Sequence, residues 1–305
     1  MKKDTLNKFT RRRFILGALG LSGAGLLLQS ANSSFNLDIS EVQITDQLLP
    51  RKFKDYRIGF LSDIHLSRWF PPEHLELVVK AVNARDLDLV ILGGDYLWVH
   101  DPILEHFFPS PLFPKIDTVS NADLGTFLIS VAGDLLAPLR ARDGVYAVLG
   151  NHDHWYLPPS KFTDFTAQGL ALLVNKEALV RRDEQKLRLF GIDDYWTGAP
   201  KIPRTGVNKS DEYRIVATHN PDLFRSALQF PNFSFNLGLA GHTHGGQIKI
   251  PGLGAPFYNV EDLRFKSGLA IVGETSIYTT RGIGTVELPI RINCPPELTV
   301  ITLSC

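Results

Sequence analysis

The chain has 305 residues, of which 44% are hydrophobic and 21% are charged. This balance favours a folded protein with a buried core and argues against an intrinsically disordered chain. Lysines plus arginines number 32, as do aspartates plus glutamates, so the formal net charge is zero. No general electrostatic attraction to nucleic acid is expected, and any anionic partner must be held locally.

Residues 1–31 have the composition of an export signal or a membrane tether. Six lysines and arginines fall within the first 13 residues, and a glycine-containing apolar run at 14–28 follows. The string TRRRFIL at 10–16 resembles the twin-arginine signal. We therefore expect the twin-arginine export machinery to deliver the protein to the periplasm or to a membrane-tethered extracytoplasmic position. An uncleaved anchor and an ordinary secretory signal are the alternatives.

Six later segments have strand character, and each ends in polar residues. Several are nearly continuous apolar runs, such as 87–92, which is typical of strands buried on both faces. The segments are 57–65, 87–95, 144–153, 187–194, 213–220 and 235–244.

Helical patterns lie between these segments. Apolar residues form one stripe over 72–84, behind an N-terminal proline, and 124–142 repeats the pattern. The tail at 287–303 is predicted to form strands with a turn at Pro295 and Pro296. Alternating strands and helices predict an α/β (α+β) layered domain whose chemistry lies beyond the carboxyl ends of the strands.

Five polar clusters follow the predicted strands and hold seven candidate metal ligands. Because residues two apart on a strand share a face, Asp63 and His65 are expected to bind one ion, and His242 and His244 to reach the same pocket. Neighbouring glycines let the backbone turn sharply. The seven ligands are Asp63, His65, Asp95, Asn151, His219, His242 and His244.

Four imidazoles, two carboxylates and one amide are too many for one tetrahedral ion and suit two neighbouring divalent ions that share a carboxylate. The nitrogen-rich set favours Mn, Fe, Zn or Co over calcium and magnesium. Two divalent ions outweigh the two carboxylates, so the site attracts a phosphate ester. Such ions lower the pKa of a bound water from about 16 to about 7, which supplies a bridging hydroxide for attack on phosphorus.

His152 has no expected place on a metal and is a candidate general acid facing the leaving oxygen, a role worth about 100- to 10,000-fold in rate. The adjacent Asp153 is a candidate to orient it.

The order of the clusters along the chain resembles the calcineurin-like metallophosphoesterase superfamily over residues 56–305. The strings LAGHTHGGQI at 239–248, RGIG at 281–284 and LPIRINCPPE at 288–297 are similar to the bacterial, often twin-arginine-exported, YkuE-like phosphodiesterase branch. A related branch hydrolyses UDP-2,3-diacylglucosamine in lipid A synthesis. This chain departs from many relatives at 97–120, where it carries a Pro- and Phe-rich insertion.

The resemblance implies a four-layer sandwich of two mixed β-sheets flanked by helices. We place the metallophosphoesterase domain at 56–305 and expect a lead-in strand in 32–55 before it. It also implies that His152 is the catalytic histidine and that Asp95 bridges the two metal ions. The first ion would be bound by Asp63, His65 and His244, and the second by Asn151, His219 and His242.

Four tryptophans each follow a strand-end cluster by a few residues, namely Trp69, Trp98, Trp155 and Trp196. We expect them at the rim of the site, where they and the insertion hold the apolar part of a substrate or rest on a membrane surface. Ordinary loop packing is the alternative. Arg281 lies near two glycines and is a candidate phosphate contact, with a surface salt bridge as its alternative.

Three functions remain open on these residues. The first is a phosphodiesterase or pyrophosphatase acting on a lipid- or cell-envelope-linked phosphate. The second is a phosphomonoesterase on small soluble esters, and the third a non-enzymatic envelope-binding protein with a structural metal site. Cys294 and Cys305 either pair in an oxidising compartment or remain one buried and one terminal thiol.

Overall fold

The computed structural model describes residues 36–67, 69–99, 120–204, 206 and 211–305. The predicted export segment at 1–31 and nearly all of the predicted insertion at 97–120 lie outside these ranges. In the described chain, no helix is both long enough and apolar enough to cross a membrane.

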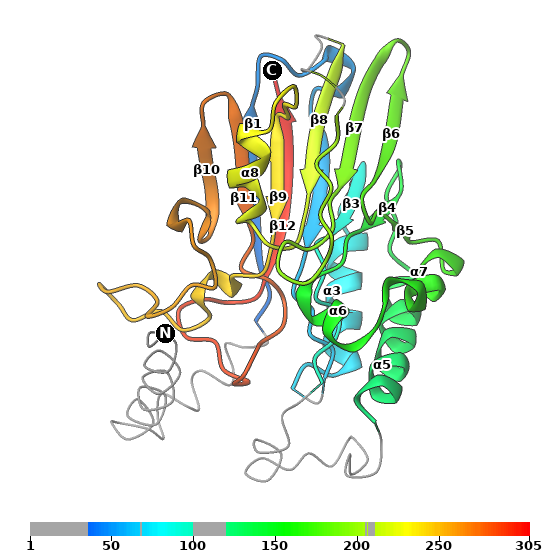
Figure 1. Cartoon of the computed structure of the whole chain (residues 1–305), viewed down its shortest axis with the longest axis vertical. Helices are drawn as coiled ribbons and strands as arrows, with labels where there is room; N and C mark the ends of the chain where they lie inside the picture. The colour runs from blue at the N-terminus through cyan, green and yellow to red at the C-terminus, as the bar shows by residue number, and fades with distance from the viewer. Residues whose placement is uncertain (1–35, 68, 100–119, 205, 207–210) are drawn as a thin grey trace, which may run out of the picture.

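The first of two six-stranded sheets has the strand order β1-β12-β2-β3-β4-β5 (Figure 1). β12 runs antiparallel to β2, and the other neighbours are parallel. The lead-in strand expected in 32–55 is β1. The strands are β1 (Asp38–Thr45), β2 (Tyr56–Leu61), β3 (Leu89–Leu92), β4 (Val145–Ala147), β5 (Ala171–Leu172) and β12 (Glu297–Ser304).

The second sheet has the order β10-β11-β9-β8-β7-β6. Its two edges are antiparallel hairpins, and its central neighbours are parallel. The strands are β6 (Lys176–Arg182), β7 (Gln185–Gly191), β8 (Glu212–Ala217), β9 (Leu237–Ala240), β10 (Gly268–Val272) and β11 (Thr275–Thr279).

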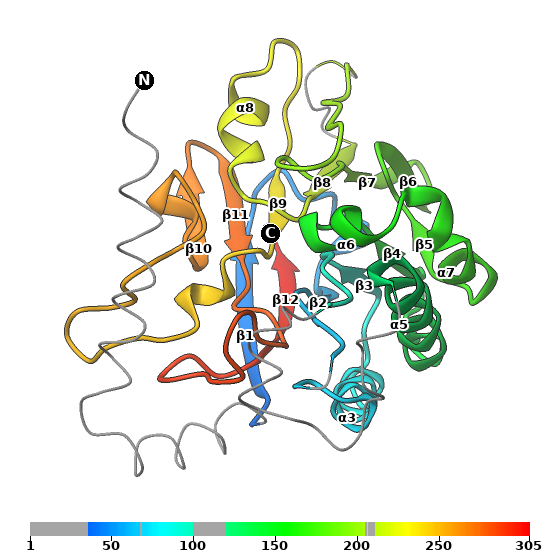
Figure 2. The same cartoon turned by 60° about the horizontal axis from the view of Figure 1, so that its bottom comes forward.

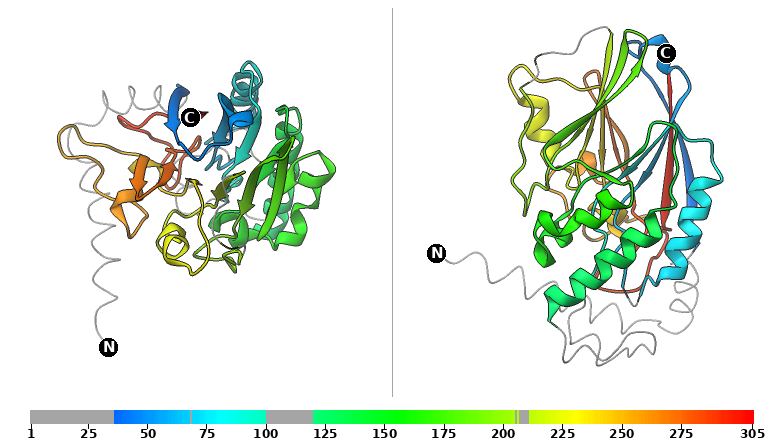
Figure 3. Two further views of the ribbon diagram at one scale, coloured as in Figure 1. Left: turned by 90° about the horizontal axis from the view of Figure 1, so that it is seen from above. Right: turned by 90° about the vertical axis from the view of Figure 1, so that its right-hand side faces the viewer.

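Helices cover the outer faces of both sheets. The α-helices are α3 (Pro72–Asn83), α5 (Asn121–Leu136), α6 (Asn151–Tyr156), α7 (Thr163–Ala167) and α8 (Leu223–Gln229). The short 3-10 helices are η1 (Arg51–Phe53), η3 (Pro159–Phe162), η4 (His244–Gly246) and η5 (Leu263–Phe265). The right-hand view of Figure 3 shows α3 and α8 on opposite outer sides of the paired sheets.

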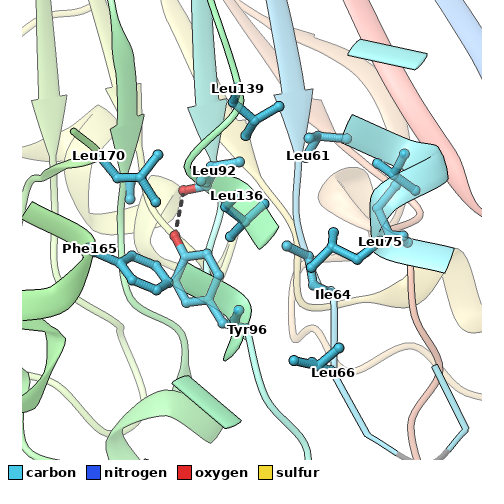
Figure 4. Close-up of a cluster of buried hydrophobic side chains, with 14 of the residues drawn as sticks. Leu61, Ile64, Leu66, Leu75, Leu92, Tyr96, Leu136, Leu139, Phe165 and Leu170 are labelled. Atoms are coloured by element: carbon cyan, nitrogen blue, oxygen red, sulfur yellow. Dashed lines mark hydrogen bonds between the residues drawn. The ribbon is translucent and has the colours of Figure 1, made fainter. Parts of the chain in front are cut away.

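Alternation along the strands divides the core into three layers. In β2, Leu61 packs under the helices, whereas Ile58 and Phe60 face the second sheet. Figure 4 shows the helix side, where Tyr96 packs against Phe165 and its hydroxyl donates to the carbonyl of Leu92 at 3.3 Å. A third cluster joins α8 to the second sheet. The predicted four-layer sandwich is therefore confirmed.

The strands end earlier than the sequence patterns indicate. β2 stops at Leu61 and β3 at Leu92, so Asp63, His65 and Asp95 lie in the loops that follow. The segment predicted as a strand at 144–153 holds only the short β4 and then enters α6. These polar residues lie outside the strands because the backbone leaves the extended conformation there, as the positive φ angles of Asp63, His65 and Asp95 show.

Two other predicted elements also differ. The helix expected at 124–142 ends at Leu136, because Pro138 cannot donate the next helical hydrogen bond. The tail expected to be several strands contains one long strand, β12, preceded by irregular chain that contributes to the site.

Candidate functional site

Two groups of buried side chains that are able to bind a metal ion lie at the carboxyl ends of the central strands. The first group is Asp63, His65 and His244, and the second is Asp95, His219 and His242. Within each group the ligand atoms all lie within 4.8 Å of one another. The geometry therefore brings these predicted residues together, and it separates His242 from His244 as the family resemblance implies and not as the strand pattern does.

The turns that present these ligands have an unusual backbone. Asp63, His65, Asp95, His242 and His244 all have positive φ angles, between 48° and 70°. The left-handed region is disfavoured for residues with a Cβ, and such conformations cluster at functional sites. The expectation that Asp63 and His65 share a strand face is therefore wrong, because local turns bring the two side chains together.

The first group has two imidazoles in close approach. Nε2 of His65 lies 3.1 Å from Nε2 of His244, and the rings are stacked. Oδ1 of Asp63 lies 3.4 Å from Nε2 of His244. Two facing ring nitrogens beside a carboxylate are satisfied when a cation lies among them.

The second group is arranged around His219. Its Nδ1 lies 2.8 Å from the carbonyl oxygen of Gly93 and donates to it, which directs Nε2 into the site. Nε2 of His219 lies 3.0 Å from Oδ2 of Asp95 and 3.2 Å from Nδ1 of His242.

Asp95 lies between the two groups. Its Oδ2 is 3.5 Å from Nε2 of His65 in the first group and 3.0 Å from Nε2 of His219 in the second. A single carboxylate oxygen thus reaches an imidazole of each group, which is the placement expected of a bridging ligand.

Asn151 supplies a further oxygen. It is the first residue of α6 and is buried, and its Oδ1 has no hydrogen-bond partner among the described residues. Buried polar atoms are normally satisfied, and a divalent ion would satisfy this one. The orphaned oxygen and the facing imidazoles fit the expected pair of divalent metal ions.

Close contact between two loops positions Asp95 and Asn151. Gly94 has a φ of 90°, and a side chain there would meet the backbone of Gly150 at 2.6 Å. A side chain at Gly150 would in turn meet the backbone nitrogen of Asp95 at 2.7 Å. Glycine is needed at both positions because the loops after β3 and β4 touch.

Asp153 secures the same contact. Its carboxylate accepts hydrogen bonds from the backbone N–H groups of Gly150, Asp95 and Tyr96, at 2.8 to 2.9 Å. The prediction that Asp153 orients the His152 ring is therefore wrong, because its oxygens are engaged with backbone amides. Asp153 instead holds the Asp95 loop.

The electrostatics also favour bound cations. Burial lowers the pKa of His65 and His244 well below the usual value and that of His242 to about 3, so these imidazoles are neutral, as metal ligands must be. Burial opposes charge on His219 as well, but the carboxylates of Asp95 and Asp63 outweigh it and raise the pKa of His219 to about 10. Positive charge is thus favoured between the carboxylates.

Comparison with known proteins agrees with this geometry. Residues 56–246 match the sequence profile of the calcineurin-like phosphoesterases. The chain belongs to this family. The Bacillus subtilis (strain 168) protein described as uncharacterized metallophosphoesterase YkuE is 30% identical, over 98% of this chain and 99% of its own length. Phosphodiesterase YaeI of Escherichia coli (strain K12) is 33% identical, over 82% of this chain and 84% of its own.

A third relative is the uncharacterized metallophosphoesterase Cj0846 of Campylobacter jejuni subsp. jejuni serotype O:2, which is 28% identical over 99% of this chain and 73% of its own length. Membership of the family makes the chain a metal-dependent phosphoesterase, and the family uses divalent metals.

In this phosphoesterase, His152 lies beside both ligand groups. Its ring centroid is 4.9 Å from that of His65, and its backbone N–H donates to Oδ1 of Asp95 at 2.9 Å. The ring is almost fully buried, and burial lowers the pKa of His152 to about 4. His152 is therefore a neutral imidazole at neutral pH.

Three of the predicted rim tryptophans contact site histidines. Trp98 and Trp155 pack on His152 with ring centroids 4.5 and 4.4 Å away, and Trp196 packs on His242 at 4.3 Å. Trp155 is 54% exposed and Trp196 is 47% exposed. Trp69 is half-buried in the loop after β2, where its backbone N–H donates to Ser67.

An ion pair joins the two segments that carry the exposed tryptophans. Nε2 of His154, on α6, lies 2.7 Å from Oδ1 of Asp193, which follows β7. Figure 2, which brings the lower end of the molecule forward, shows α6 between β8 of one sheet and β4 of the other. The pair of His154 and Asp193 thus connects the part of the rim that follows the first sheet to the part that follows the second.

Arg281, the candidate phosphate contact, lies among acidic side chains. Its guanidinium pairs with Asp38 and lies 3.4 Å from Glu297, so its salt-bridge alternative is the one observed. Sequence reasoning missed Arg291, which is fully buried and donates to the carbonyls of Gly284 and Cys294.

Nη2 of Arg291 lies 3.3 Å from Nδ1 of His244, so this arginine supports the first ligand group from behind. In the sequence, Arg291 could have been recognised as a buried arginine because it lies within a mostly apolar stretch. Cys294 is buried and Cys305 exposed, and both are free thiols, so the disulfide alternative is not adopted.

Proposed function

We propose that this phosphoesterase hydrolyses a phosphodiester or pyrophosphate bond in a lipid- or cell-envelope-linked substrate, for example UDP-2,3-diacylglucosamine or a phospholipid. The observation that carries two-metal hydrolysis is the position of Asp95 Oδ2 between two groups of imidazoles. The relative YaeI is described as a phosphodiesterase, which agrees with this proposal.

The bound divalent ions, which we propose to be Mn, Fe, Zn or Co, supply a Lewis acid for the phosphoryl oxygens and acidify water. Asp63, His65 and His244 would hold one ion, and Asn151, His219 and His242 would hold the other, with Asp95 available to both. His152 lies beside both groups of ligands. We assign it to hold the leaving oxygen and donate a proton to it once the substrate anion has raised its pKa.

The rim supports the choice of a lipid-linked substrate. Trp155 and Trp196 are large, partly exposed rings that touch the site through His152 and His242. Tyr195, beside Trp196, is 39% exposed. Aromatic rings with one wet edge suit an amphipathic ligand whose phosphate is polar and whose acyl chains are not.

The proposed location agrees with such a substrate. We propose that the chain is exported by the twin-arginine pathway and acts in the periplasm or from a membrane tether. Signal-dependent export can be measured by fractionating cells that carry the wild-type chain and cells that carry Arg11→Lys/Arg12→Lys/Arg13→Lys. Cytoplasmic accumulation of the variant alone supports the proposal, and equal export of both contradicts it.

The central test compares substrates on the purified protein loaded with Mn²⁺. Bis-p-nitrophenyl phosphate, p-nitrophenyl phosphate, UDP-2,3-diacylglucosamine, phospholipids and nucleotide diesters are supplied at matched concentrations. Turnover of the diester and of one lipid-linked substrate is expected. Turnover of the monoester alone assigns the chain to phosphomonoesterases, and turnover of none contradicts the proposed substrate class.

The rim is tested separately with Trp155→Ala and Trp196→Ala. Each is expected to raise KM for the lipid-linked substrate by about 10-fold, because a large ring loses its contact with the acyl chains. Turnover of bis-p-nitrophenyl phosphate should change much less. Equal loss on both substrates would show that the rings support the histidines rather than the lipid.

A further inference from the structure

A tight turn on the β9–β10 connection presents apolar side chains to solvent. Ile250 and Gly254 exchange two backbone hydrogen bonds, of 2.8 and 2.9 Å, which close the turn. Leu253 at its tip is 81% exposed, and Ile250 and Phe257 are 41% and 48% exposed. The turn is ordered by its backbone, so these side chains are held outward.

The charge within the segment that carries this turn is one-sided. Residues 248–260, here called the apolar loop, contain Lys249 and no acidic residue. The ammonium of Lys266 lies 5.5 Å from the ring centre of Tyr258 in the same loop. The acids that follow the loop are neutralised, since Glu261 pairs with Arg225 and Asp262 with Arg264. The exposed surface is therefore apolar with a cationic margin.

The apolar loop lies beside the metal-ligand turn. A side chain at Gly246, two residues after His244, would meet Ala255 and would meet Tyr258 at 3.0 Å. The loop is also tied to the irregular chain before β12, because the N–H of Lys249 donates to the carbonyl of Ile292 at 2.9 Å. Figure 1 shows this loop, in yellow-orange, at the lower end of the molecule.

The described chain begins at the same end. Asp38, the first residue of β1, pairs with Arg281, and a side chain at Gly245 would meet Arg281 at 2.7 Å. The apolar run of the N-terminal segment ends at residue 28, and only residues 29–37 separate it from β1. Nine residues span roughly 30 Å at most. A tether at 14–28 would therefore keep the metal-site end close to the bilayer.

We propose that the apolar loop docks on an anionic lipid surface, with Leu253 and Phe257 inserted and Lys249 and Lys266 near the headgroups. Apolar tips flanked by cations are suited to this interface. Docking there turns the metal site toward the membrane, which deepens the proposed function by placing the site where a lipid phosphate is found. The docking itself does not require that a lipid be the substrate.

The experiment uses the full chain bound to vesicles of phosphatidylethanolamine and phosphatidylglycerol that contain nitroxide-labelled lipid. A fluorescent probe is attached to Leu253→Cys, in a Cys305→Ser background that removes the exposed thiol. The matched control is Leu48→Cys, because Leu48 is also an exposed leucine, at 46%, but follows the far end of β1. Quenching by the nitroxide lipids is expected at 253 and not at 48.

Equal quenching at both positions, or quenching at 48 alone, overturns the proposal. A probe at 253 that becomes shielded only as protein concentration rises, without lipid quenching, assigns the apolar loop to contact between copies of the chain and also overturns it. Replacing phosphatidylglycerol with phosphatidylcholine is expected to weaken the quenching, because the two lysines lose their anionic partners.

A second comparison separates docking from catalysis. Leu253→Ser is expected to lower turnover of a vesicle-embedded lipid diester by roughly 10-fold, and to leave bis-p-nitrophenyl phosphate unchanged. Leu48→Ser should change neither. If no lipid is hydrolysed, the proposed substrate is wrong, whereas the quenching result still decides the docking.

Discussion

The loops that leave the first sheet carry both carboxylates, Asp63 and Asp95, and the amide of Asn151, whereas the loops of the second sheet carry only imidazoles, His219, His242 and His244. His65 is the one imidazole ligand that the first sheet adds. Each ligand group therefore draws on both sheets, and neither sheet holds a complete site.

This division means that metal binding and the packing of the sheets depend on each other. The apolar layer between the sheets sets their spacing, and the ligands at its edge meet only when that spacing is right. Because an unfolded chain has no preformed site, metal binding adds directly to the stability of the packed sheets.

The largest effect is expected for Asp95→Asn, because the Asp95 carboxylate approaches imidazoles of both ligand groups. The change keeps the shape of the side chain but removes the charge that lies between the two groups. Both metal ions should be weakened together, and activity should fall by at least about 1000-fold, since several kcal/mol of metal-based stabilisation are lost. Metal content by elemental analysis and diester turnover measure the two losses. Retention of one full metal equivalent would show that Asp95 does not serve both groups.

His152 lies on α6, which follows a strand of the first sheet, and it is expected to act without binding metal. The substitution His152→Ala tests this role. Metal content should stay unchanged, and esters with poor leaving groups should be hydrolysed about 100- to 10,000-fold more slowly. Esters with good leaving groups should be affected much less. Equal slowing of both would assign His152 to phosphate binding rather than proton transfer.

The ligand set was predictable from sequence because metal chemistry restricts it to a few residue types. Continuous apolar runs such as Leu89–Leu92 also identified the buried strands. The polar residues immediately after these runs then marked the end of the molecule where the site lies.

The partition of the ligands followed from the family resemblance but not from the strand pattern. His242 and His244 are two residues apart, but each has a positive φ, so the chain between them turns and sends the side chains to different groups. That turn depends on contacts with distant residues, such as Cys294, whose thiol donates to the carbonyl of His244. Arg291 was missed for the same reason, because its partners lie in separate loops.

Arg291→Lys tests the chain that connects the two sheets, since Arg291 lies between β11 and β12 and approaches His244. Lysine keeps the charge but cannot reach the same carbonyls, so His244 loses support. Metal affinity of the first group is expected to fall about 10- to 100-fold, and the second group should keep its affinity. Metal titration of the apoprotein resolves the two groups.

The matched control is Arg281→Lys, which alters an arginine that pairs with Asp38 near the surface. A change of less than about fivefold is expected there. If both substitutions weakened metal binding equally, the effect would belong to the loop as a whole and not to the contact with His244.

The smallest expected effect concerns the ion pair between His154, from the first sheet, and Asp193, from the second. Burial alone lowers the pKa of His154, but the bond to Asp193 and the nearby Asp153 and Asp194 outweigh it and raise the pKa above the ordinary 6.5. Burial would raise the pKa of Asp193, but His154 and backbone amides hold it below the ordinary 3.8.

The signs of these shifts set the pH range of the ion pair. The contribution of His154 is complete below about pH 6.5 and is lost as pH rises through its raised folded pKa. The contribution of Asp193 is complete above about pH 4 and is lost as pH falls through its lowered folded pKa.

His154→Asn should therefore destabilise the metal-loaded protein by about 1–2 kcal/mol at pH 6 and by less at pH 9. Thermal unfolding of both proteins at the two pH values measures the difference, with Asp193→Asn and the double variant completing the cycle. The same loss at pH 6 and pH 9 would mean that His154 joins the sheets by packing alone.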